Sequence, residues 1–63
     1  MSYCRFENTA RDLEDCVDAI YNDEHLDLGS TYEIDGFQRL IELAHKIVDM
    51  DIDVDWVIQQ HEN

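Results

Sequence analysis

The sequence contains no proline and only two glycines, so little in it interrupts a helix. It also lacks the run of about 18 apolar residues that a membrane-spanning helix needs. Its opening residues have no apolar core of the kind that marks a secretory signal. We therefore expect a protein of the cytoplasm, without membrane contact and rich in helix. Hydrophobic residues still make up 44% of the chain, which is not typical of a disordered composition.

Cysteine, histidine and catalytic motifs are also sparse. Cys4 and Cys16 are too few for a disulfide framework, and in a reducing cytoplasm both are expected to be free thiols, with Cys16 in the core. The three histidines are scattered and lack the ligand spacing of a zinc site. The sequence has no Gly-rich phosphate loop, nucleophile elbow or convincing Cys–His pair. We therefore expect no enzyme and no cofactor.

Calcium is the obvious alternative use for clustered aspartates. Asp51, Asp53 and Asp55 match the first, third and fifth positions of an EF-hand loop. Trp56 then takes the sixth position, where such a loop needs glycine for its sharp turn. The sequence therefore predicts no metal site.

Basic residues are scarce compared with acidic residues. Four bases stand against sixteen acids, giving a formal net charge of −12. Nucleic-acid phosphates would be repelled by this charge, so direct binding to nucleic acid is not expected. A partner protein with a basic surface would be attracted.

The longest amphipathic segment runs from Ser30 to Asp49. The pattern Ser30-Thr31-Tyr32-Glu33 matches a capping box and predicts a helix over about 31–50. The apolar positions cover about half of the helix circumference, which is more than one neighbouring helix covers. We therefore expect them to form a homodimer interface, and they are Ile34, Phe37, Leu40, Ile41, Leu43, Ala44, Ile47 and Val48.

One shorter helix is expected before this long helix and another after it. Thr9 and Asp12 form a second capping-box pattern, which predicts a helix over about 9–22. The stretch 50–58 alternates like a strand, but Asp53 as an N-cap favours a short helix over about 54–61. The fold class is therefore all-α: a helical hairpin with a short third helix, forming a single domain over 1–63 and assembled as a homodimer.

The acids are unevenly distributed along the chain. On the long helix, Asp35–Arg39 and Glu42–Lys46 have the spacing of ion pairs that neutralise one another. From residue 12 to residue 27 there are seven acids and no base, and four more acids lie between residues 49 and 55. The expected partner-binding residues come from these two stretches: Asp12, Glu14, Asp15, Asp18, Asp23, Glu24, Asp51, Asp53 and Asp55.

The opening residues MSYCRFENT, followed by Asp12-Leu13 and Asp15-Cys16, resemble a group of small acidic proteins encoded by bacteriophages and prophages. A looser similarity covers residues 39–43. The group has no established activity, so the resemblance implies no catalytic or binding residues. It implies a phage origin and a bacterial host cytoplasm, where small acidic proteins often resemble inhibitors of nucleases, restriction systems or CRISPR effectors.

Three functional hypotheses follow. The first is an inhibitor that binds a host nucleic-acid-processing or defence protein through acids that mimic nucleic acid. The second is a structural or adaptor module that binds through apolar surface at Tyr32, Leu43 and Trp56, with the acids serving solubility only. The third, ranked last, is a binder of a small cationic or nucleotide-like ligand at the dimer interface, for which the sequence offers no phosphate-cradling motif.

Overall fold

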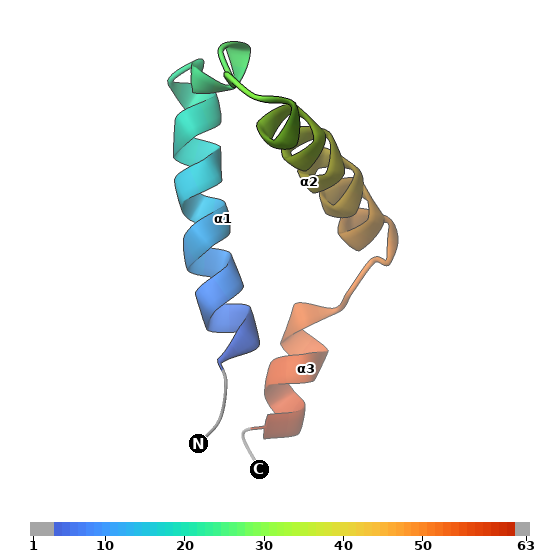
Figure 1. Ribbon diagram of the computed structural model, residues 1–63. Helices are drawn as coiled ribbons and strands as arrows, with labels where there is room; N and C mark the ends of the chain where they lie inside the picture. The colour runs from blue at the N-terminus through green and yellow to red at the C-terminus, as the bar shows by residue number, and fades with distance from the viewer. Residues whose placement is uncertain (1–3, 62–63) are drawn as a thin grey trace. The chain divides into compact units, whose positions relative to one another are not determined.

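The computed structural model describes residues 4–61, and the described chain is helical. The elements in order are α1 (Arg5–Tyr21), the short 3-10 helix η1 (Glu24–Leu26), α2 (Thr31–Asp49) and α3 (Val54–His61), as Figure 1 shows. No strand occurs between residues 4 and 61. The all-α class is therefore confirmed. The chain divides into two units, one up to Ser30 and one from Thr31, and each is described by itself below.

Helix α1 begins at Arg5, four residues before the predicted start at Thr9. The N-cap is Cys4, which makes no side-chain cap hydrogen bond, and Thr9 lies inside the helix. The predicted boundary was therefore wrong. Two local features favour the earlier start. Glu7 lies in the first turn, where a carboxylate is favoured by the helix dipole, and it forms an ion pair with Arg11 one turn later.

The end of α1 is followed by a tight reversal that the sequence did not reveal. The amide of Asp23 donates to the carbonyl of Ile20 at 3.0 Å, and Asp23 itself has a left-handed backbone with φ of 62°. Aspartate tolerates this region better than most residues do. The turn leads directly into η1. Gly29, with φ of 77°, then supplies the second left-handed residue before α2.

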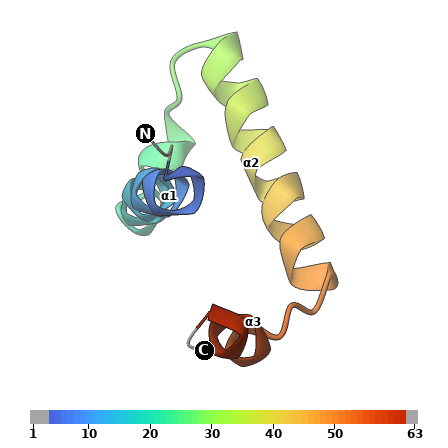
Figure 2. The same cartoon turned by 90° about the horizontal axis from the view of Figure 1, so that it is seen from below.

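Helix α2 matches its prediction at both ends. It starts at Thr31, directly after the proposed cap residue Ser30, and it ends at Asp49. Figure 2 shows it as a continuous helix along its length. A Cβ added at Gly36 would meet no atom within 4 Å, so no close helix crossing depends on this glycine within the described chain. Gly36 is simply tolerated, at a cost of about 1 kcal/mol relative to alanine.

Helix α3 confirms the choice of helix over strand for this part of the chain. Asp51 has a left-handed backbone with φ of 51°, which ends the run from α2. Asp53 is the N-cap, because its Oδ1 accepts a hydrogen bond from the backbone N–H of Trp56 at 3.1 Å. This single cap bond starts a helix of only eight residues.

Removing that bond should unfold α3. An isolated helix of eight residues is far below the length that is stable in water, so the loss of a cap worth about 1 kcal/mol is expected to be decisive. We expect Asp53→Ala to shift the backbone NMR signals of residues 54–61 toward random-coil values. Asp53→Asn, which retains a cap oxygen but not the charge, should leave them helical. Equal helicity in both variants would contradict a role for the cap.

No residue in the described part of the chain is fully buried. The most enclosed positions are only partly covered, among them Cys16, Leu40 and Ile41. Cys16 is only partly covered, so its expected core position is not found within the single chain. Most helical stability in proteins comes from packing of an amphipathic face. The apolar side chains of each helix within residues 4–61 are therefore partly or largely exposed.

Candidate functional site

Helix α1 separates its charges from its apolar residues. At about 100° per residue, Leu13, Val17 and Ile20 lie on one side of the helix. The other side carries acids over two turns, and these are Asp12, Glu14, Asp15 and Asp18. All four are exposed. Acids three or four residues apart on a helix have Cβ atoms about 5–6 Å apart, a spacing comparable to that of phosphates along one nucleic-acid strand.

Arg11 lies in the middle of this acidic side. Its Nη2 is 3.7 Å from Oε1 of Glu7, and both side chains are well exposed. Asp15 also lies four residues from Arg11 in the sequence, but it is not within ion-pair distance of Arg11 in the described structure. Because Arg11 turns back to Glu7, the four acids that follow it have no base within ion-pair distance in the described structure. Glu7 was not singled out from the sequence, although its spacing of four from Arg11 would have identified it once the helix was known to start at Arg5.

The remaining acids of this first unit continue the surface beyond the helix. Asp23 lies at the left-handed turn, Glu24 opens η1, and Asp27 follows η1. All three are exposed. The structure therefore places seven exposed acids in one unit, and we call them the N-terminal acidic cluster: Asp12, Glu14, Asp15, Asp18, Asp23, Glu24 and Asp27.

The C-terminal aspartates belong to the second unit. Asp51 lies in the connection after α2, Asp53 caps α3 and Asp55 lies in the first turn of α3. All three are exposed. Asp53 differs from the others because one of its oxygens is already engaged by the backbone of Trp56. Any substitution at Asp53 therefore perturbs the fold as well as the charge.

The predicted ion pairs of α2 are not formed. Arg39 and Lys46 have no carboxylate within ion-pair distance in the described chain. Glu42 instead accepts a hydrogen bond of 3.5 Å from Nε2 of Gln38. This result agrees with the small energies of exposed pairs, which seldom repay the ordering of two long side chains. The outer side of α2 still has a nearly balanced charge, because both bases lie among its acids.

The apolar face of α2 is largely open to solvent. Val48 is 75% exposed, Ile47 58% and Ile34 53%, and Leu43 is also exposed. Phe37, Leu40 and Ile41 are partly covered. The eight predicted interface residues therefore do lie along one helix, and the chain covers none of them fully.

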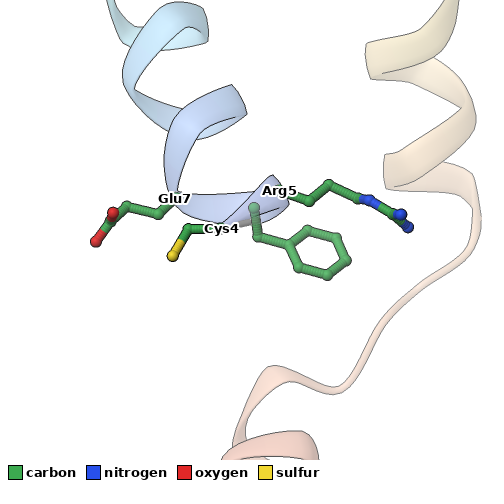
Figure 3. Close-up of a pocket in the computed structure, with 4 residues that line it drawn as sticks. Cys4, Arg5 and Glu7 are labelled. Carbon is green, nitrogen blue, oxygen red and sulfur yellow. The ribbon is translucent and has the colours of Figure 1, made fainter. Parts of the chain in front are cut away.

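A hollow occurs at the first turn of α1, lined by Cys4, Arg5, Phe6 and Glu7. Figure 3 shows that the side chains of Arg5 and Glu7 extend in opposite directions. The hollow therefore does not bring an acid and a base together around a reacting group. Among the residues that the structure describes, no group of three or more His, Cys, Asp or Glu side chains is placed to hold a metal ion.

The comparisons with known proteins add no further assignment. No protein-family model, curated protein or solved structure matches this chain. Within residues 4–61, none of the helices combines the length and the apolar character required to cross a bilayer.

Proposed function

We propose that this chain is a non-enzymatic protein that binds and inhibits a host nucleic-acid-processing or defence protein in the bacterial cytoplasm. The observation that carries this proposal is the N-terminal acidic cluster, seven exposed acids without an ion-paired base. Like charges held this close destabilise the helix that carries them. A binding function explains why the helix nevertheless carries these acids. The similarity of the opening residues to phage-encoded proteins supports the same setting.

The proposed mechanism is competition for a basic channel. A protein that binds nucleic acid lines its site with lysine and arginine, and most of its affinity comes from contacts with phosphates. The acids of α1 would occupy the same basic side chains at a similar spacing. The C-terminal residues Asp51, Asp53 and Asp55 would add a second acidic contact.

We further propose that the chain works as a homodimer of helical hairpins. Small domains of this length often need oligomerisation to bury enough apolar surface. The open face of α2, with Ile34, Ile47 and Val48 more than half exposed, supports this assembly. The acids of α1 would remain outside the interface, because they lie opposite the apolar side of their own helix.

Salt concentration tests the mode of binding. We expect a host protein captured from bacterial lysate at about 0.1 M salt to be released at about 1 M, because the screening length falls from about 10 Å to about 3 Å. Duplex DNA added at low salt should release the same protein, because both ligands occupy one channel. A captured protein that DNA cannot displace would contradict the competitive mechanism even if salt releases it.

A second candidate function is favoured by the exposed aromatic residues. Tyr32 is 90% exposed and Trp56 58%, and tryptophan and tyrosine are common anchors of protein interfaces. A structural or adaptor module would bind through these side chains and through Leu43, with the acids serving solubility only. Apolar contacts persist or strengthen in high salt, so a partner retained at about 1 M salt would favour this function.

A further inference from the structure

The apolar face of α2 has a self-complementary order along the helix. Residues whose numbers add up to 81 form pairs about the midpoint between Leu40 and Ile41. Ile34 then corresponds to Ile47, Phe37 to Ala44, and Leu40 to Ile41. Six of the eight apolar positions therefore pair with one another, whereas Leu43 and Val48 correspond to the polar residues Gln38 and Glu33. In two antiparallel helices related by a twofold axis at that midpoint, such residues lie at the same level, because each residue rises by the same 1.5 Å.

We propose that α2 pairs with α2 of a second copy in antiparallel orientation, centred between Leu40 and Ile41. This inference rests on the homodimer put forward above and specifies its geometry. The occupant of this face is then a second copy of this chain, because six of its apolar positions match one another about a twofold axis. Side-chain volume and charge favour the antiparallel orientation.

Side-chain volume favours the antiparallel arrangement. Phe37 and Ala44 lie closest to the middle of the apolar face, and they differ strongly in side-chain volume. Antiparallel pairing places each Phe37 at the level of a partner Ala44, so a large side chain meets a small one on both sides of the twofold axis. Parallel pairing would place phenylalanine against phenylalanine and alanine against alanine. It would therefore crowd one level and leave a cavity at the other, and both defects reduce stability.

Charge favours the same arrangement. Glu33 lies at the N-terminal end of α2 on the apolar side of the helix. In a parallel pair the two Glu33 residues would meet at one end of the interface. Antiparallel pairing separates them by about 22 Å along the helix axis, taking 1.5 Å per residue. It also sets the two helix dipoles in opposite directions.

The outer side of α2 offers three matched positions for a test. Asp35, Glu42 and Asp49 are exposed and seven residues apart, so they share nearly the same side of the helix. Cysteine would be introduced at one position at a time in the full chain, with Cys4→Ala and Cys16→Ala to remove the native thiols. A spin label on each cysteine then allows the distance between the two copies to be measured by electron paramagnetic resonance.

The expected result is a distance that depends on position. Antiparallel pairing predicts axial separations of about 5 Å for position 42, about 17 Å for position 35 and about 26 Å for position 49, at 1.5 Å per residue. Parallel pairing predicts one distance at all three positions, and this result would overturn the proposed geometry while leaving the dimer intact.

Sedimentation of the same labelled samples tests the existence of the dimer separately from its geometry. A monomer at the labelling concentration would overturn both the dimer and its geometry. A dimer whose distances increase in the order 42, 35 and 49 would support both. Neither outcome depends on inhibition of a host protein, so the inhibitor proposal stands or falls on the salt and DNA experiments.

Discussion

Replacing Glu14, Asp15 and Asp18 with lysine should weaken binding of the host protein by about 100-fold. Each exposed charge contact contributes about 0.5 kcal/mol, and reversal replaces attraction by repulsion of similar size. Three reversals therefore remove about 3 kcal/mol, which corresponds to a factor of about 100 in the dissociation constant. The measurement is a binding titration with the captured protein at about 0.1 M salt.

The matched control reverses three acids outside the proposed contact. Asp35, Glu42 and Asp49 lie together on the outer side of α2. Replacing them with lysine gives the same net charge of −6 as the first variant, since each reversal adds two charges to −12. Circular dichroism verifies that both variants remain helical. If the control loses binding as strongly as the α1 variant, net charge and not the N-terminal acidic cluster determines the interaction.

Replacing Ile41 with glutamate should dissociate the dimer and lower the helical content. Ile41 lies next to the proposed twofold axis, so each dimer would carry two carboxylates at its centre. Losing the burial of isoleucine costs about 1.5–3 kcal/mol at each site. Two sites correspond to an increase of at least about 100-fold in the dimer dissociation constant, measured by sedimentation equilibrium.

The control for this variant is Gln38→Glu, which adds the same charge on the polar side of α2. Gln38 donates a hydrogen bond to Glu42, so the substitution brings two carboxylates together at a cost of only a few tenths of a kcal/mol. We expect this variant to remain a dimer. An Ile41→Glu protein that remains dimeric at the same concentration would place the interface elsewhere on the chain.

The long helix and the short third helix were predictable because their signals are local. The capping pattern at Ser30 and the apolar period set the bounds of α2, and Asp53 proved to be the cap of α3. The start of α1 lies four residues before the predicted one, because the helix extends past the capping-box pattern at Thr9 to include the Glu7–Arg11 pair. The turn at Asp23 was missed, because aspartate in a left-handed conformation leaves no periodic signal.

The acidic residues of the candidate site were predictable from the sequence, but the ion pairs around them were not. The acids of residues 12–27 are evident in the sequence, and α1 places four of them opposite its apolar side. The choice of Arg11 between Glu7 and Asp15 depends on side-chain geometry, which the sequence does not specify. The same holds for Arg39 and Lys46, whose predicted ion pairs are absent from the described structure.

If a second copy covers the apolar faces, folding depends on cellular abundance, because no residue in the described chain is fully buried. Helices of 17 and 19 residues with open apolar faces gain most of their stability from packing against another surface. If that surface is a second copy, mass action sets the folded fraction, and dilution shifts the chain toward forms that proteases degrade. Such a protein would persist during a burst of synthesis and be cleared once synthesis stops, so that its half-life would limit the duration of its action.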